Sequence, residues 1–331
     1  MANGARAAVV LVNVGTPDSP TPHDVRVFLR EFLSDRRLIA LPPLLWQPIL
    51  NGFILPRRSH RSAEKYASVW TEQGSPLMVH TLAQEDALAA RLGDGVRVVA
   101  AMRYGELRLS VVLDGLAADG VGRVLVVPMF PQYSTTTVAT VFDALERYLA
   151  TLAHQPEYRT IRAWHDDPGY IEAAALRVEQ AWAKEGRPGF EHGDKLLLSF
   201  HSIPVAIARA GDPYPDECVH TARLLRDRLG LDEESAPMTF QSKFGPAAWL
   251  TPATIDTVRA LGDAGVRRLD VFCPGFAADC LETDEEIGIL NRNAYHEHGG
   301  QRFVRIPSLN DFEPWMDAFA DIVRRNLADW M

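Results

Sequence analysis

The sequence has few cysteines and lacks several motifs that define common enzyme families. Only three of its 331 residues are cysteines, Cys218, Cys273 and Cys280, and no two of them have CxxC spacing. This excludes a disulfide framework and a four-cysteine metal site, and it indicates a reducing compartment. The sequence also contains no GxGxxG after its first predicted strand, no GxxxxGK[ST] and no GxSxG. These absences argue against the common nucleotide-binding folds and the α/β-hydrolases.

Positive charge and long hydrophobic runs are also scarce. Lys plus Arg number 34 against 43 for Asp plus Glu, a formal net charge of −9, so we expect no nucleic-acid partner. No stretch approaches the roughly 18 consecutive apolar residues that suggest a membrane-spanning helix. Residues 1–8 lack the basic, apolar and small-residue order of a secretory signal. We therefore expect a cytoplasmic protein.

Short apolar runs alternate along the chain with segments of helical period. Runs that are apolar on both faces and separated by helices predict parallel strands covered by helices on both sides. The length corresponds to about two domains, so we predict an α/β fold with two doubly wound domains and a cleft between them. The predicted strands are residues 7–14, 97–102, 123–130, 160–164, 195–200, 238–241, 268–273 and 302–306. The predicted helices are residues 24–33, 107–118, 137–152, 171–184, 219–229, 252–261, 281–290 and 311–327.

Ligands of such folds bind beyond the carboxyl ends of the strands, where this chain places a histidine and three carboxylates. His201 follows a fully apolar run, and its imidazole can accept a proton or bind a metal; the alternative is a histidine that satisfies turn backbone groups. Asp279, Glu282 and Glu286 follow the seventh predicted strand at offsets that share one helical face. Crowded carboxylates raise a pKa and attract divalent cations. Asp279 and Glu282 also fit a helix N-cap box.

Aromatic residues recur at the same strand ends. This favours a large flat ligand, although scattered aromatics more often belong to a core. They are Tyr104, Tyr133, Trp164, Tyr214, Trp249 and Phe276.

An apolar, proline-rich segment spans residues 41–55 and is followed by basic residues at 57–61. It fits either contact with a membrane interface or a loop and short helix that cover the core. Its apolar members include Leu41, Leu44, Leu45, Trp46, Ile49 and Leu50.

Short motifs occur in a fixed order along nearly the whole chain. They are LVNVGTP (11–17), GSP (74–76), MRY (102–104), FPQYS (130–134), SFHSIP (199–204), GDPYP (211–215), FQSK (240–243), GP (245–246), WL (249–250) and PGFAADCLET (274–283), continuing to Glu286. In this order and spacing they resemble the motifs of ferrochelatase in its proteobacterial form, the family that inserts ferrous iron into protoporphyrin at the last step of haem synthesis.

The resemblance implies two Rossmann-like domains with the porphyrin cleft between them. The first comprises residues 1–122 and 308–331, with a returning C-terminal helix, and the second comprises residues 123–307. It also implies that residues 41–55 form an apolar lip through which porphyrin enters from a membrane surface. We therefore expect peripheral contact with the inner face of the cytoplasmic membrane and transient contact with the oxidase of the preceding step.

The resemblance assigns roles to the residues at the strand ends. His201 and Glu282 become the catalytic and metal-binding pair on opposite sides of the macrocycle, and Asp279 and Glu286 line a path for protons or metal. Whether iron arrives on the His201 side or the carboxylate side stays open. With Trp249 added from the aromatic set, the expected porphyrin-binding residues are Val14, Arg103, Tyr104, Tyr133, Trp249 and Phe276.

The resemblance makes Fe2+ a substrate, and we expect no permanently bound cofactor. Some relatives hold a [2Fe–2S] cluster through a cysteine at the position of Thr135 and three cysteines near the C-terminus. No cysteine follows Cys280 here, so we expect no cluster, and Cys280 is expected to be a small packed side chain. Two other functions stay open: a non-catalytic carrier of a tetrapyrrole or metal, and a chelatase for another porphyrin such as coproporphyrin.

Overall fold

The computed structural model describes residues 7–39, 41–245 and 247–331. Residues 1–6, which belong to the segment compared with a secretory signal, lie outside this description, as do Ala40 and Pro246 of the GP motif. The chain divides into two compact units. Unit 1 is Met1–Arg162 with Ala320–Met331, and unit 2 is Ala163–Phe319.

Unit 1 contains a four-stranded parallel sheet with the order β2-β1-β3-β4. Its strands are β1 (Ala7–Thr16), β2 (Val96–Gly105), β3 (Arg123–Pro128) and β4 (Glu157–Thr160). Its helices are α1 (Pro22–Leu33), α2 (Pro43–Ile49), the π-helix η1 (Leu50–Ile54), α3 (Leu55–Val69), α4 (Pro76–Leu92), α5 (Leu109–Ala118), α6 (Val138–Leu149) and the short 3-10 helix η4 (Ala328–Trp330).

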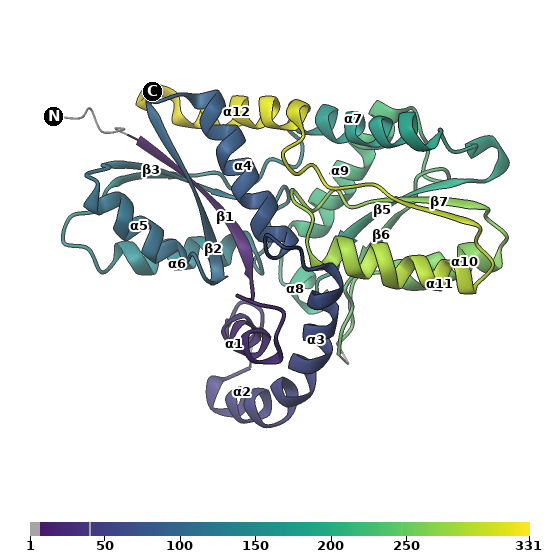
Figure 1. Cartoon of the computed structure of the whole chain (residues 1–331), viewed down its shortest axis with the longest axis horizontal. Coiled ribbons are helices and arrows are strands. Elements are labelled where there is room, and N and C mark those ends of the chain that lie inside the picture. Colours follow the sequence, from purple (N-terminus) through teal and green to yellow (C-terminus); the bar gives the residue numbers. More distant parts are fainter. Residues whose placement is uncertain (1–6, 40, 246) are drawn as a thin grey trace. The chain divides into compact units, whose positions relative to one another are not determined.

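Helices cover both faces of this sheet, as Figure 1 shows. α5 and α6 pack against Ala8, Val10 and Val12 on one face of β1, and α4 contacts β1 and β2. Residues on both faces of β1 are therefore buried, which explains why the strand reads as a continuous apolar run.

Unit 2 contains a second four-stranded parallel sheet with the order β6-β5-β7-β8. Its strands are β5 (Lys195–His201), β6 (Met238–Gln241), β7 (Arg268–Phe272) and β8 (Arg302–Arg305). Its helices are α7 (Pro168–Glu185), the 3-10 helix η2 (Phe190–His192), α8 (Val205–Arg209), α9 (Tyr214–Leu229), α10 (Thr254–Asp263), the π-helix η3 (Glu282–Asn291) and α11 (Arg292–Glu297). Helix α12 (Glu313–Leu327) begins in unit 2 and ends in unit 1.

The two sheets share one topology. In each, the first strand is central, the second lies on one side of it, and the third and fourth lie on the other. The chain therefore reverses direction across the sheet between its first and third strands, and this switch point is where ligands of open α/β sheets bind. In unit 2 it lies between β5 and β7.

The predicted α/β fold with two parallel sheets is confirmed, and β6 has the predicted bounds. Two details differ. The fourth strand is Glu157–Thr160 rather than 160–164. The boundary between the units follows Arg162 rather than residue 122, because β3 and β4 pair with the sheet of β1. On the C-terminal side, only Ala320–Met331 returns to unit 1, rather than all of 308–331.

Candidate functional site

The switch point of unit 2 brings together the two features that the sequence singled out. His201 is the last residue of β5, and the loop after β7 leads into η3, which carries Glu282 and Glu286. The ring centroids of His201 and Phe276, in that loop, are 6.4 Å apart. Glu286 lies close enough to His201 and Glu282 for both charges to affect its pKa, the histidine lowering it and the glutamate raising it.

One hydrogen bond defines the tautomer of His201. Its Nδ1 lies 2.6 Å from the carbonyl oxygen of Ser202. A carbonyl only accepts, so we assign the proton to Nδ1, and Nε2 keeps a lone pair. Since His201 is half-buried rather than enclosed, Nε2 can accept a proton or bind a metal ion. His201 can therefore act as a proton acceptor or as a metal ligand, and the hydrogen bond to the Ser202 carbonyl orients its ring for either role.

Ser242 holds both carboxylate oxygens of Glu286. The Ser242 backbone N–H donates to Glu286 Oε1 at 2.7 Å, and the Ser242 hydroxyl donates to Oε2 at 2.5 Å. Burial raises the pKa of Glu286 above its ordinary value, and the two hydrogen bonds from Ser242 oppose this rise. Ser242 has φ +67°, a conformation uncommon for non-glycine residues. The backbone is thus bent to present both donors to one carboxylate.

Gln241 connects three strand ends to the start of η3. Its Nε2 donates to the carbonyl oxygen of Glu282 at 2.9 Å, and its Oε1 accepts from the Ser199 hydroxyl at 2.7 Å and from the Cys273 thiol at 3.4 Å. Gln241 and Ser242 are therefore positioning residues that our list of site residues omitted. The signal was present, because both lie in the FQSK motif, where Gln241 is the last residue of β6 and Ser242 the first residue after it.

The helix after β7 is not the α-helix predicted for residues 281–290. η3 is a π-helix, and the N–H of Arg292 donates to the carbonyl oxygen of Ile287, five residues back. π-Helical segments occur frequently at functional sites. The predicted single face of three carboxylates is wrong in one respect, since Asp279 precedes the helix and only Glu282 and Glu286 belong to it.

Asp279 anchors the loop after β7 to the segment after β8. Its Oδ1 accepts from Arg305 Nη1 at 2.8 Å and from the Ser308 N–H at 3.0 Å, and its Oδ2 accepts from Asn310 Nδ2 at 2.8 Å. The N-cap alternative for Asp279 is also wrong, because the N-cap of η3 is Leu281 and has no side-chain cap. Both oxygens of this buried carboxylate thus hold the loop in place.

Asp284 is a further titratable group on η3 that the sequence reading missed. It lies 3.0 Å from Arg305 Nη1. Burial, with the neighbouring charge of Asp279, raises the pKa of Asp284 to about 6, against the lowering effect of Arg305. One guanidinium therefore faces two carboxylates, Asp279 and Asp284.

Two predicted porphyrin-binding residues, Tyr104 and Arg103, form hydrogen bonds to other residues of unit 1. Tyr104 is 1% exposed, and its hydroxyl donates to Asp35 Oδ2 at 2.9 Å. Arg103 donates from Nη2 to the same oxygen at 2.6 Å and from Nε to the carbonyl of Thr140 at 2.8 Å. Burial raises the pKa of the Tyr104 phenol above its ordinary value. Tyr104 and Arg103 form part of a packed, ion-paired cluster, and the structure places the Tyr104 ring in the core.

The remaining aromatic candidates divide between core and partly exposed positions. Trp164 is buried and stacks on Trp315, with ring centroids 4.9 Å apart, and Tyr214 is also buried. Trp249 is buried against Phe244 at 4.8 Å. Val14, Tyr133 and Phe276 are half-buried, and the guanidinium of Arg162 lies 4.1 Å from the Tyr133 ring centroid.

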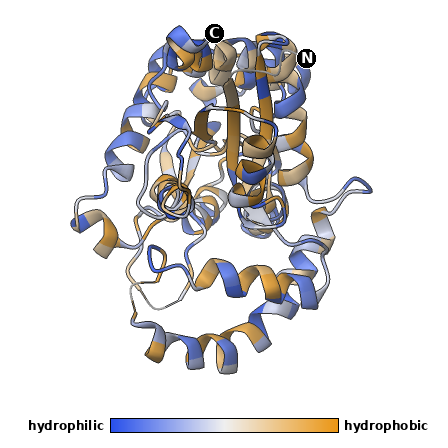
Figure 2. Cartoon of the chain, turned by 90° about the vertical axis from the view of Figure 1, so that its left-hand side faces the viewer, coloured by the Kyte–Doolittle hydropathy of each residue, from blue (hydrophilic) through white to orange (hydrophobic). Residues whose placement is uncertain are grey.

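The segment predicted as an apolar lip is mostly helical and is formed by α2 and η1. Figure 2 shows hydrophobic colour along these helices, at the lower end of the view, as well as in the strands. Leu44 is 90% exposed, Leu45 63% and Phe53 64%, and Leu41 and Ile49 are also exposed. The prediction that Leu50 belongs to the lip is wrong, because its side chain is fully buried against α1 and α3. Trp46 is half-buried, and its Nε1 donates to the carbonyl of Leu33 at 2.7 Å.

Cys280 is a packed side chain, as predicted. It is buried, and burial raises the pKa of its thiol well above the ordinary value.

None of the helices in the described ranges is both long and apolar enough to cross a membrane.

Solved structures place this architecture among the chelatases. SirB from Bacillus subtilis with Fe3+ is 12% identical with a TM-score of 0.57, over 98% of this chain and 96% of that one. The sirohydrochlorin chelatase SirB from Bacillus subtilis subspecies spizizenii in complex with cobalt is 9% identical with a TM-score of 0.54, over 97% and 95%. DR2241 from Deinococcus radiodurans, described as structurally similar to chelatases, is 15% identical with a TM-score of 0.51, over 99% and 56%. These similarities establish a chelatase-like α/β fold.

The family follows from the sequence match. The ferrochelatase family model matches residues 6–327. The chain therefore belongs to the ferrochelatase family, and this membership supports a metal chelatase of the lyase class with a tetrapyrrole and a metal ion as substrates.

Proposed function

We propose that this protein inserts Fe2+ into protoporphyrin IX and so forms haem. The observation that carries the proposal is the arrangement at the β5–β7 switch point, where the lone pair of His201 Nε2 and two glutamates of η3 come together. The order and spacing of the sequence motifs, which resemble ferrochelatase, support protoporphyrin as the tetrapyrrole.

The chemistry requires the loss of two protons and no change of oxidation state. Free porphyrin carries two pyrrole N–H groups, and Fe2+ replaces both protons while it gains four Fe–N bonds. We propose that His201 Nε2 accepts the first proton, because its Nδ1 proton is already held by Ser202. Glu286, whose pKa burial raises, is suited to take up or relay the second proton with Glu282. A pocket that binds a distorted macrocycle would further lower the barrier, since distortion exposes the nitrogen lone pairs.

The test is anaerobic incubation of the protein with Fe2+ and protoporphyrin, with conversion to haem followed by absorption. We expect turnover by the wild type and loss of at least about 100-fold in His201→Ala, the lower range of a general-base contribution. His298→Ala is the matched control, since His298 is a surface histidine that pairs with Asp263 at 2.9 Å. Near-normal turnover by His201→Ala would refute the assignment.

Parallel assays separate the alternatives. Porphyrin binding without conversion would support the carrier function. Faster conversion of coproporphyrin, or of sirohydrochlorin, the substrate class named for SirB, would keep the chelatase and change its tetrapyrrole.

We also propose that the exposed apolar side chains of α2 and η1 contact the cytoplasmic face of the membrane, where a preceding oxidase would deliver porphyrin. The exposure of Leu44, Leu45 and Phe53 supports this, because contiguous exposed apolar side chains mark interaction surfaces. Leu44→Glu should weaken co-sedimentation with anionic lipid vesicles. Val111→Glu, at a 63% exposed position of α5, is the control and should bind as the wild type does. If Leu44→Glu binds the vesicles as well as Val111→Glu and the wild type do, this surface does not contact the membrane.

A further inference from the structure

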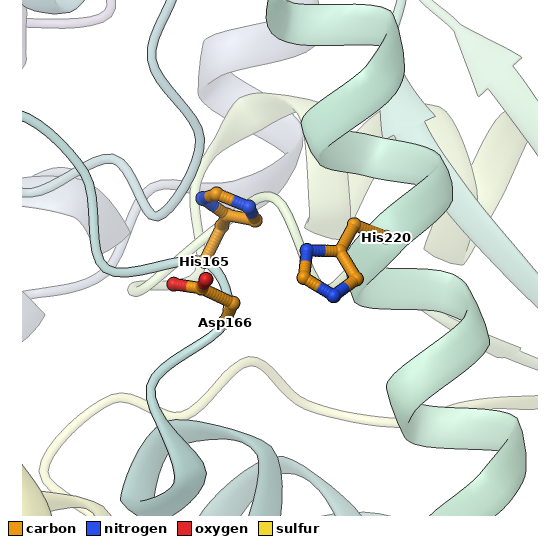
Figure 3. Close-up of side chains that lie close together, drawn as sticks. All are labelled: His165, Asp166 and His220. Carbon is orange, nitrogen blue, oxygen red and sulfur yellow. The ribbon is translucent and has the colours of Figure 1, made fainter.

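A second group of metal-ligating side chains lies in unit 2 and shares no residue with the site around His201. His165 and Asp166 follow β4, and His220 lies on α9. Figure 3 shows the two imidazoles and the carboxylate around a common space. One potential ligand atom from each residue lies within 4.8 Å of the others. This spacing allows a single ion to contact all three.

Hydrogen bonds fix the loop that carries His165 against α9. The hydroxyl of Thr221, the residue after His220, donates to the carbonyl oxygen of His165 at 3.0 Å. On the other side, Asp167 caps α7 by accepting from the Gly169 N–H at 2.9 Å. The loop is therefore held at both ends, and the spacing of the three side chains does not depend on an ion to bring them together.

Glu217 adds a carboxylate behind one imidazole. It lies one helical turn before His220 on α9, and its Oε2 is 3.4 Å from His165 Nδ1. The two side chains are only 10% and 13% exposed. A carboxylate against one nitrogen of a metal-binding histidine is the usual outer-shell partner, since it orients the ring and raises its basicity.

We propose that His165, Asp166 and His220 bind one divalent transition-metal ion, with Glu217 orienting His165. Two imidazoles and a carboxylate suit Zn2+, Fe2+, Co2+ or Ni2+, whereas Mg2+ and Ca2+ prefer all-oxygen sites. Three protein ligands leave a position open to water or another ligand, as in zinc sites that are not purely structural. Asp166 is exposed and both histidines are half-buried, so the bound ion is exchangeable.

The experiment is a Co2+ titration followed by visible absorption and calorimetry in a His201→Ala background, which removes the other histidine candidate. We expect one equivalent of Co2+ to bind, with competition by Zn2+ and none by millimolar Mg2+. Asp166→Asn and His220→Ala should each weaken binding by at least about tenfold, the lower range for perturbing a metal site. His154→Ala, which removes an exposed histidine of unit 1, should bind Co2+ like its parent.

Unchanged Co2+ affinity in Asp166→Asn and His220→Ala would overturn the proposal. Asp166 is exposed, so its substitution tests the site even if His220→Ala folds poorly, and circular dichroism shows which variants are folded. The readout is binding, not haem formation. Failure of porphyrin metallation with intact Co2+ binding would therefore refute the proposed function alone, and the reverse result would refute this site alone.

Discussion

The hydrogen bonds from Ser242 to Glu286 offer the sharpest test of the active-site assignment. Ser242→Ala removes the hydroxyl that donates to Glu286 Oε2 at 2.5 Å and keeps the backbone N–H that donates to Oε1. Hydrogen bonds to the ionised carboxylate lower its pKa, so the loss of one should raise the pKa of Glu286 further above its ordinary value. The carboxylate would then become protonated at a higher pH than in the wild type.

The size of the effect follows from the type of bond. A hydrogen bond to a charged group contributes about 1.5–3 kcal/mol, and one pKa unit corresponds to about 1.4 kcal/mol. If Glu286 must be ionised to work with His201, activity falls as the pH drops through the Glu286 pKa. The acid limb of the pH–rate profile should therefore move up by about 1 to 2 pH units in Ser242→Ala.

The assay is initial-rate metallation of porphyrin across the pH range in which the wild type stays folded. Ser242→Gly is the companion variant, because it also lacks the hydroxyl but relieves the positive φ of +67°. Both variants should show the same displaced acid limb. Only Ser242→Gly should recover thermal stability, because a non-glycine residue in this region costs about 1–3 kcal/mol.

Two results would count against the reasoning. An acid limb that does not move in either variant would mean that Glu286 does not control it. A limb that moves in Ser242→Ala alone would trace the effect to the backbone rather than to the lost hydrogen bond.

Two further predictions concern the carboxylates around Arg305. Asp279→Ala leaves the Ser308 N–H and the Asn310 amide without their acceptor and leaves Arg305 with Asp284 alone. It should cost about 2–6 kcal/mol of unfolding free energy in urea titrations, at about 1–3 kcal/mol for each unsatisfied buried donor. A loss below about 1 kcal/mol would contradict the anchoring role. Asp284 keeps its proton up to about pH 6 in the folded chain, against an ordinary value of 3.8, so its burial makes the protein less stable as the pH rises from about 4 to 6. Asp284→Asn should flatten that part of the stability–pH curve, and an unchanged slope would exclude Asp284 as its source.

Local patterns predicted most strands of this fold. Strands that are buried on both faces, such as β1 and β5, are continuous apolar runs between turns, so their positions follow from the residues themselves. The same patterns did not place the unit boundary, because it depends on β3 pairing with β1 and on β4 pairing with β3. The residues of a single strand do not determine which strand it pairs with.

The candidate site was predicted in part for a similar reason. His201 and Glu282 were identified because they follow apolar strands at the carboxyl edge of a sheet. The anchoring role of Asp279 depends on Arg305, Ser308 and Asn310, which lie 26 to 31 residues away. A π-helix and an α-helix also have no separate signature in the spacing of apolar residues, so η3 was predicted as α-helical.

The return of the chain to unit 1 has a consequence for biosynthesis. Ala320–Met331 belongs to unit 1, and Arg159 on β4 donates to the carbonyl oxygens of Asn326 and Leu327 and to the carboxylate of Asp329. Domains generally fold as the ribosome releases them, the N-terminal one first. Here the order is inverted. All residues of unit 2 are synthesised before Ala320–Met331, which unit 1 needs to be complete. A chain truncated after residue 319 and released from the ribosome should therefore show a protease-resistant unit 2 beside an unfinished unit 1.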